Sequence, residues 1–309
     1  MRHLYLILAI AALAFVGCNV DDEGREFFAL DTPELENAHV LTSKVITGAE
    51  PKGAESFRTL REWGVKTVIS VDGAKPDLEN AHAQGIRYVH LPLGYDGIKQ
   101  ERAELVAKAI LESEGRVYVH CHHGKHRGPA AAAAACVVLG ELVNAEAVRA
   151  LQTIGTGEEY QGLWKAARET KRVCHKNLKK IDCKFVESAP VPPLAEAMVH
   201  ADEVMANLKL CQEAGWKTPQ DHKDLEPAHE ALKMRELFFE MMRTEAEKSR
   251  PEEYRKMSKA TEDAARALET KLREKDLSAE DRAKAAGALF MTLKQSCTDC
   301  HKTYRNNSW

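Results

Sequence analysis

A chain of 309 residues, 44% of them hydrophobic, is long enough to form two domains of ordinary size. Its formal net charge of −3 is close to neutral, so the overall charge gives no reason to expect nucleic acid as a partner. The eight cysteines are too few to specify a disulfide-stapled scaffold, and each must therefore be considered in its local context.

Residues 1–18 have the pattern of an export signal. Arg2 precedes an apolar run from Leu4 to Val16 that is too short to span a bilayer permanently. The string at residues 15–18 resembles a bacterial lipobox, in which the cysteine becomes the lipidated first residue. We therefore expect a periplasmic lipoprotein, anchored to the membrane through Cys18, with an ordinary signal peptide cut beside Cys18 as the alternative. Residues 19–37 are predicted to form a polar tether.

Residues 38–172 alternate short β-branched runs with helical stretches, which predicts an α/β domain. We expect its central sheet to be of the parallel type and to be flanked by helices. Strands are predicted at residues 45–47, 67–71, 87–91 and 117–120. Helices are predicted at residues 54–63, 77–83, 101–111, 128–139, 145–153 and 160–171.

The last predicted strand leads into a loop that has the composition of a phosphate site. Cys121 follows the strand, Arg127 comes six positions later, and a helix begins at Gly128. A loop between a strand end and a helix N-terminus directs backbone N–H groups to one place, which favours an anion. Cationic neighbours favour the thiolate of Cys121, which can attack phosphorus, and the Arg127 fork can hold phosphoryl oxygens. We predict that Cys121 and Arg127 are catalytic and that the substrate is bound by His122, His123, Gly124, Lys125, His126 and Gly128.

The alternative for this segment is a buried cysteine beside a histidine-rich, metal-binding loop. However, His120, Cys121 and Arg127 match a His-Cys-x5-Arg signature. The segment resembles the cysteine-dependent protein tyrosine and dual-specificity phosphatases, and the resemblance covers most of residues 38–172. It implies a phosphocysteine intermediate on Cys121. The family usually has Ser or Thr after the arginine, where its hydroxyl assists release of the thiolate, but this chain has Gly128.

Phosphoryl transfer to a thiolate leaves an oxyanion that needs a proton, so a carboxylic acid must approach from another loop. In the phosphatase family this acid follows a strand that ends in a Pro-Leu pair, and residues 91–96 fit that pattern. The resemblance makes Asp96 the candidate general acid, in a loop that two glycines flank. Asp72 is the alternative, and either residue can instead be a solvated turn aspartate.

Composition changes at residues 173–193, which we interpret as a linker that ends in an extended, proline-rich spacer. Cys174 and Cys183 in this linker can form a disulfide in an oxidising compartment or remain thiols. Residues 194–309 contain long amphipathic stretches, which predict an all-α four-helix bundle. Its helices are expected at residues 194–215 and 225–247 and after capping boxes at 249–252 and 278–281.

Cys297, Cys300 and His301 form the attachment signal of c-type haem, in which two thioethers hold the macrocycle and the histidine ligates iron. A disulfide oxidoreductase motif and a zinc half-site are the alternatives. Residues 194–309 resemble cytochrome c prime and its six-coordinate relatives. This resemblance implies one covalent haem c and makes Met198 the candidate sixth ligand. Met205 shares the face of Met198, His200 is a possible ligand on a less apolar side of the helix, and a five-coordinate iron is the alternative.

The two halves together predict an exported phosphomonoester hydrolase that carries a haem domain for electron transfer or redox sensing. We expect its substrate to be a phosphorylated protein or a small anionic phosphomonoester. Its other expected partners are the membrane, through the lipid, and a redox partner that the sequence does not specify. The alternative is a haem-based redox or gas sensor whose phosphatase-like domain binds anions with little turnover.

Overall fold

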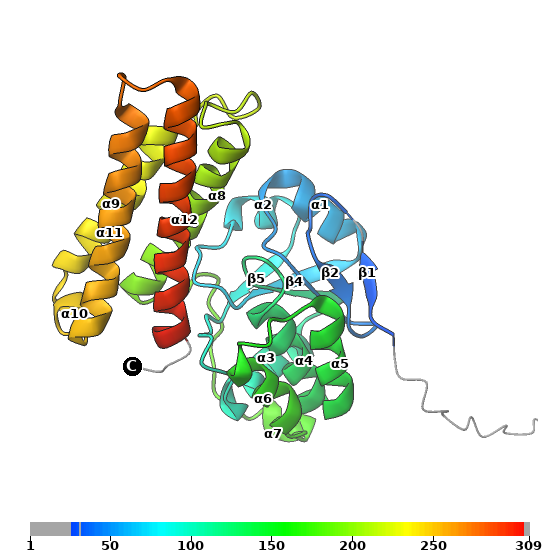
Figure 1. Ribbon diagram of the computed structural model, residues 1–309. Helices are drawn as coiled ribbons and strands as arrows, with labels where there is room; N and C mark the ends of the chain where they lie inside the picture. Colours follow the sequence, from blue (N-terminus) through cyan, green and yellow to red (C-terminus); the bar gives the residue numbers. More distant parts are fainter. Residues whose placement is uncertain (1–25, 31, 306–309) are drawn as a thin grey trace, which may run out of the picture.

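The computed structural model describes residues 26–30 and 32–305 as an α/β unit followed by a helical unit (Figure 1). The predicted export signal and the lipidation site at Cys18 lie outside the described residues. Among the helices of the described part of the chain, none combines the length and the apolar character that a membrane span requires.

The α/β unit is built on a six-stranded mixed sheet with the strand order β1-β2-β3-β6-β4-β5. The four strands β3, β6, β4 and β5 are parallel, as predicted, whereas β1 and β2 extend the sheet with antiparallel pairings. The strands are β1 (Phe28–Leu30), β2 (Ala38–Val40), β3 (Val45–Gly48), β4 (Val65–Ser70), β5 (Arg87–His90) and β6 (Arg116–His120).

Strand β1 corrects the expectation of a polar tether over residues 19–37. Phe28 lies opposite Val40 in the β1–β2 ladder, so the backbone of this stretch is hydrogen-bonded in the sheet. Phe27 is 8% exposed and Leu35 is 1% exposed, and both side chains belong to apolar clusters of the α/β unit. The last part of the predicted tether is therefore part of the fold.

Side chains alternate across the sheet, as expected for strands that are covered on both faces. On β6, Val117 and Val119 join one apolar cluster and Tyr118 joins the other. The Tyr118 face packs against α1 (Gly53–Glu62) and α2 (Leu78–Ala83). The opposite face packs against the helical layer α3 (Gln100–Glu112), α4 (Arg127–Leu139), α5 (Asn144–Ile154) and α6 (Gln161–Glu169).

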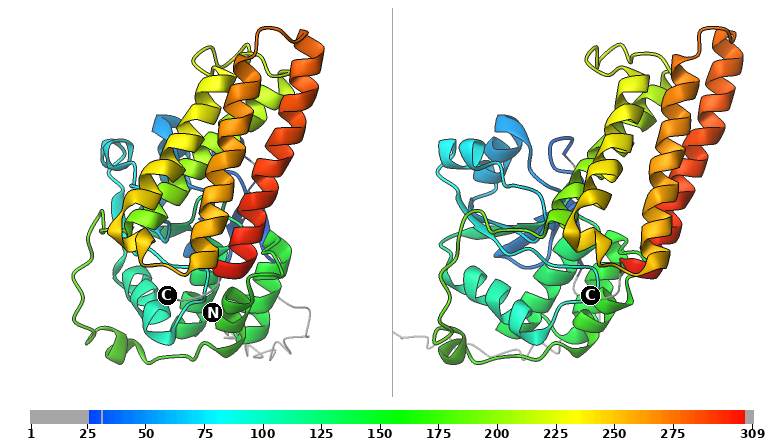
Figure 2. Two further views of the ribbon diagram at one scale, coloured as in Figure 1. Left: turned by 60° about the vertical axis from the view of Figure 1, so that its left-hand side comes forward. Right: turned by 90° about the vertical axis from the view of Figure 1, so that its left-hand side faces the viewer.

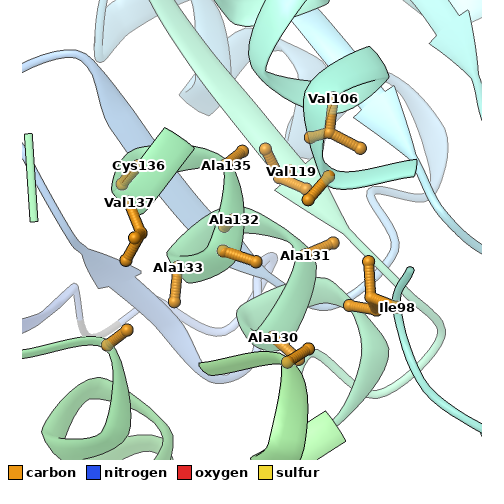
Figure 3. Packing of buried hydrophobic residues seen from close by; sticks show 14 of the residues in the cluster. Ile98, Val106, Val119, Ala130, Ala131, Ala132, Ala133, Ala135, Cys136 and Val137 are labelled. Atoms are coloured by element: carbon orange, nitrogen blue, oxygen red, sulfur yellow. The ribbon is translucent and has the colours of Figure 1, made fainter. Parts of the chain in front are cut away.

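Helix α4 starts at the predicted phosphate loop and runs through the centre of the larger cluster. Its residues 130–135 are all alanine and fully buried. Figure 3 shows Ala131 and Ala135 near Val119 of β6, in the same cluster as Val106 of α3. Because a methyl group takes little room, the helix lies close to the strand that delivers Cys121, and the loop between them is held at both ends.

Four long helices of the helical unit run side by side around a shared apolar core (Figure 2). Leu208, Met234, Leu268 and Phe290 contribute one core side chain each from the four helices. The helices are α8 (Pro193–Glu213), α9 (Pro227–Arg243), α10 (Glu245–Lys248), α11 (Glu252–Arg273) and α12 (Ala279–Tyr304), of which α10 is a single turn.

The helix predicted over residues 225–247 is interrupted. Thr244 lies between α9 and α10, and its hydroxyl accepts a hydrogen bond from the Glu247 amide, which caps α10. The capping box predicted at residues 249–252 is also wrong, since α11 follows Pro251 and has no side-chain cap. Ser278 caps α12 through the Asp281 amide, as the sequence predicts.

The linker is extended but fastened to the α/β unit. After α7 (His175–Leu178), it passes the edge strand β5, where the His90 amide donates to the Val186 carbonyl at 2.9 Å. The Ala189 amide donates to Nδ1 of His90 at 3.0 Å. No disulfide joins Cys174 and Cys183 in the described part of the chain. The spacer therefore reaches the helical unit from a fixed point on the sheet edge.

Candidate active site

The loop at residues 121–127 turns its carbonyl groups outward. The carbonyl of His122 accepts from the Glu50 amide at 3.1 Å, and that of His123 accepts from Nδ2 of Asn37 at 2.9 Å. The carbonyl of Lys125 accepts from the Thr156 hydroxyl at 2.6 Å. Within a planar trans peptide, the following N–H points the opposite way, so the amides of residues 123, 124 and 126 face the loop interior. Such converging N–H groups form an anion-binding nest.

Two glycines permit this loop conformation. Gly124 has a φ of 68°, in the left-handed region that glycine adopts without steric cost. A Cβ atom at Gly128 would lie 2.9 Å from the Cys121 amide nitrogen and 3.1 Å from the His120 carbonyl carbon. The backbone of α4 therefore touches the backbone of the nucleophile. This contact explains why position 128 lacks the hydroxyl-bearing side chain that is usual in the phosphatases.

Cys121 and Arg127 lie at the two ends of the loop, as the sequence predicts. Cys121 is 2% exposed at the end of β6. Arg127, the first residue of α4, donates from Nη1 to the Leu93 carbonyl at 3.2 Å and from Nη2 to Oδ1 of Asp72 at 3.1 Å. Among the described residues, Nε of Arg127 has no hydrogen-bond partner, so it can donate to a phosphoryl oxygen.

Asp72 and Asp96, the two acid candidates, occupy different surroundings. Burial alone would raise the pKa of Asp72, but the charge of Arg127, nearby histidines and a hydrogen bond from the Gly73 amide together lower that pKa below its usual value. Asp72 is therefore ionised at neutral pH and has no proton to donate. Asp96 is exposed, and in the described structure it has no hydrogen bond or ion pair with residues 121–127. Its neighbour Tyr95 reaches the site, so Asp96 as general acid stays a prediction about this loop.

His120 anchors the strand end beneath the loop. Its Nε2 lies 2.6 Å from the Tyr88 hydroxyl, and the imidazole stacks on Tyr118. Burial lowers the pKa of His120 to about 4, so the imidazole is neutral at physiological pH. The Tyr118 hydroxyl in turn donates to the Ala49 carbonyl at 2.7 Å. This network fixes the residue that precedes the nucleophile.

The helical unit completes the wall of the site with residues that the sequence did not assign to it. Arg305 follows α12, and its Nη1 donates to the Tyr160 hydroxyl at 3.0 Å. The rings of Tyr95 and Tyr160 lie 5.1 Å apart, and the Arg127 guanidinium lies 4.4 Å from the Tyr95 centroid. Asp202 of α8 reaches the loop histidines. Helices α8 and α12 are the ones next to the α/β unit in Figure 1.

The predicted haem ligands lie at the end of the helical unit that faces this site. Cys297 and His301 lie close enough to Asp202 for its charge to act on both. Met198 precedes Asp202 by one turn of α8 and packs against the apolar core, as does Met205. Burial lowers the pKa of His301 to about 4, which leaves the neutral imidazole that an iron ligand requires. This donor set fits a c-type haem.

The cysteine at the strand end, the arginine at the helix N-terminus and the inward amides lie together at one edge of the α/β sheet, an arrangement that can hold a phosphoryl group beside a thiol. Of the residues predicted to bind the substrate, those at positions 122–126 form the loop itself and Gly128 lies in the first turn of α4, and their contact with a substrate stays a prediction. No sequence signal marks Tyr95 or Tyr160, because neither belongs to the phosphate-loop motif.

Roughly the first half of the chain is similar to solved phosphatase structures. P. aeruginosa TpbA is 25% identical over 46% of this chain and 96% of its own, with a TM-score of 0.38. The core catalytic domain of the PP-IP phosphatase SIW14 from S. cerevisiae, in complex with citrate, is 15% identical to this chain. The match covers 47% of this chain and 90% of that domain, with a TM-score of 0.40. A DUF442 protein from Shewanella putrefaciens is 20% identical to this chain. The match covers 43% of this chain and 91% of that protein, with a TM-score of 0.36. No protein-family model matches the chain, and neither does any curated protein.

Proposed function

We propose that the chain is an exported phosphomonoester hydrolase that works through a phosphocysteine and carries one covalent c-type haem on its helical unit. The phosphatase half of this proposal rests on the outward carbonyls of His122, His123 and Lys125, which leave an inward nest of amides between Cys121 and Arg127. Such a nest matches the charge that a transferring phosphoryl group carries on its equatorial oxygens.

The mechanism uses Cys121, Asp96, Arg127 with its partner Asp72, and the amides of the loop. The thiolate of Cys121 attacks phosphorus, the ester oxygen leaves, and Asp96 gives that oxygen its proton. Nη2 of Arg127 stays hydrogen-bonded to Asp72, while its Nε and the loop amides donate hydrogen bonds to the phosphoryl oxygens. Water then attacks the phosphocysteine, which releases phosphate and restores the thiolate. Asp96 can accept the proton of that water.

The walls of the site favour an aryl phosphate as the first substrate to test. Tyr95 and Tyr160 place two aromatic rings beside Arg127, and a phenyl leaving group can pack on them. The positive charges of Lys125 and Arg127 suit an anionic substrate, either a phosphorylated protein or a small phosphomonoester.

Hydrolysis of p-nitrophenyl phosphate by the full chain tests the enzyme. We expect Cys121→Ser to abolish turnover and Cys174→Ser, at an exposed position of the linker, to leave it unchanged. If the parent chain binds phosphate without turnover, the hydrolase proposal fails. The chain would then be an anion-binding module attached to a haem sensor.

The haem half of the proposal rests on the Cys-x-x-Cys-His string and on the packing of the helical unit. We propose that α8, α9, α11 and α12 form a haem-binding four-helix bundle of the cytochrome c prime type, to which Cys297 and Cys300 supply thioethers and His301 an iron ligand. When bound, the group supplies one-electron redox chemistry or gas binding. Export, from the pattern of residues 1–18, agrees with this, since c-type haem is attached outside the bacterial cytoplasm.

An absorption spectrum tests the haem. We expect a Soret band that acid-acetone does not extract, and its loss in the Cys297→Ala/Cys300→Ala variant. Addition of reductant then tests Met198: a low-spin ferrous spectrum that turns high-spin in Met198→Ala identifies a sixth ligand, with Met205→Ala as the matched control. A Soret band that acid-acetone removes would refute covalent attachment.

A further inference from the structure

Three metal-ligating side chains meet where helix α8 approaches the phosphate loop. Oδ2 of Asp202 lies 3.2 Å from Nε2 of His122 and 3.2 Å from Nε2 of His123. The three ligand atoms lie within 4.8 Å of one another. His122 and His123 come from the loop of the α/β unit, whereas Asp202 comes from the helical unit. The cluster therefore joins the two units beside the nucleophile.

The spacing of these atoms suits a metal ion. Zinc binds imidazole nitrogen and carboxylate oxygen at about 2.0–2.2 Å, so neighbouring ligands of a tetrahedral site lie about 3.3–3.5 Å apart. The two observed separations of 3.2 Å are close to that value. Two imidazoles and a carboxylate fill three positions and leave the fourth for water. Imidazole nitrogen selects zinc, copper, nickel or iron over magnesium and calcium.

A second carboxylate orients the most buried of these ligands. Oε2 of Glu50 lies 3.2 Å from Nδ1 of His122, and the Glu50 side chain is only 13% exposed. When Nδ1 carries the proton and donates a hydrogen bond to Glu50, Nε2 is unprotonated and its lone pair points to the side of the ring where Asp202 lies. A carboxylate on the far nitrogen of a histidine is the usual second shell of a metal site. Glu50 thus sets the tautomer that binding requires.

We propose that His122, His123 and Asp202 form a binding site for a divalent transition-metal ion that ties the phosphate loop to helix α8. The His123 side chain is 56% exposed and that of Asp202 is 49% exposed, so an ion has access from solvent. A bound ion adds positive charge next to the phosphate nest and fixes the helical unit against it. The proposed site rests on the geometry of its three ligand atoms, which does not depend on the haem or on phosphatase turnover.

Zinc titration of the full chain by isothermal calorimetry tests the site. The titration is done on the chain as purified and is repeated in the Cys297→Ser/Cys300→Ser background, because cysteines that carry no haem also bind zinc. We expect one Zn²⁺ per chain, at least tenfold weaker binding in Asp202→Ala and in His123→Ala, and roughly tenfold weaker binding in Glu50→Gln. Circular dichroism of each variant shows that the fold is retained. Zn²⁺ should also raise the melting temperature of the parent, and Asp202→Ala should remove that rise.

The matched control is His200→Ala. His200 lies on the same helix, its side chain is 60% exposed, and it pairs with Glu203 instead of the loop. Its variant should bind zinc as tightly as the parent. The proposal is overturned if the parent binds no Zn²⁺, if Asp202→Ala keeps the parent affinity, or if His200→Ala weakens binding as much as Asp202→Ala does.

Discussion

The guanidinium carbon of Arg305 lies 3.6 Å from the centroid of the Tyr95 ring, so the end of the helical unit covers an aromatic residue of the phosphatase site. Arg127, which is predicted to hold the phosphoryl group, contacts the same ring at 4.4 Å. Tyr95 is therefore shared by an arginine from each unit, and the helical unit helps to shape the substrate site.

Arg305→Ala should raise the KM for p-nitrophenyl phosphate by roughly threefold to tenfold and change kcat less. A cation–π contact contributes about 0.5–2 kcal/mol, and its loss frees Tyr95 to move. Steady-state kinetics of the full chain measure the effect. Lys302→Ala is the control, since Lys302 is exposed on the same helix. A KM that is equal in all three proteins would show that Arg305 does not shape the substrate wall.

Asp96→Asn should impair substrates with basic leaving groups most. General acid catalysis contributes about 10²- to 10⁴-fold, and a nitrophenolate needs less protonation than a phenolate. We therefore expect a large loss of kcat with phenyl phosphate and a smaller one with p-nitrophenyl phosphate. Asp72→Asn, which changes a partner of Arg127, should lower both rates by the same factor. A uniform loss in Asp96→Asn would mean that the proton comes from another group.

Asp72→Asn should destabilise the protein and make its stability depend more strongly on phosphate. Loss of one partner from a buried ion pair costs about 3–5 kcal/mol, and the Arg127 side chain is only 12% exposed. An oxyanion in the nest can then replace the missing carboxylate. Urea unfolding with and without inorganic phosphate should show a larger phosphate effect in the variant than in the parent. An equal effect in both proteins contradicts the pairing of Asp72 with the phosphate-binding arginine.

Gly128→Ala should lower kcat/KM by about tenfold, because the new Cβ, 2.9 Å from the Cys121 amide nitrogen, would displace the backbone of the nucleophile by a few tenths of an ångström. The reintroduced hydroxyl of Gly128→Ser should not rescue activity, for the same steric reason. Gly287→Ala is the control: the nearest atom to its added Cβ is 3.9 Å away, and alanine stabilises a helix by about 0.5–1 kcal/mol. A fully active Gly128→Ser would disprove the steric explanation.

The free energy of unfolding should fall as pH drops from 6.5 towards 4. Burial lowers the pKa of His120 to about 4; burial and the charge of Arg305 lower that of His126 to about 4. The unfolded chain then binds protons that the native chain does not, so stability is full above pH 6.5 and is lost on acidification. Urea titrations at pH 7.5, 5.5 and 4.5 measure how the free energy of unfolding changes with pH, and His126→Gln should make this change smaller. A flat profile over this window would contradict neutral, buried histidines.

The part of the site that is contiguous in the chain was predictable, because each of its elements has a signal in its own short stretch of sequence. The strand at residues 116–120, the cysteine loop and the alanine-rich helix are contiguous, and period and composition identify each of them. Thr244 shows a signal that was present but missed: Thr244 to Glu247 is a capping box that predicts a new helix start. Strands β1 and β2 are too short for a period-2 pattern to emerge.

The remainder of the site depends on contacts between segments that are far apart in the chain. Asp202 and Arg305 look like ordinary surface charges on amphipathic helices, and only the docking of those helices brings them to the loop. Gly128 is a similar case. The sequence shows only that the usual hydroxyl is missing at this position. The close approach of α4 to the Cys121 backbone shows that a side chain there would be too near.

The two hydrogen bonds that fasten the linker to His90 also determine how far the helical unit can move. Beyond Ala189, only residues 190–192 separate the anchored backbone from the start of α8 at Pro193. Three residues span about 10 Å when fully extended. Because the connection is so short, α8 has a high effective concentration at the phosphate loop, even if its contacts with that loop are weak. Undocking is thus a local tilt followed by rapid return, and even weak contacts at Asp202 or Arg305 keep the site covered most of the time.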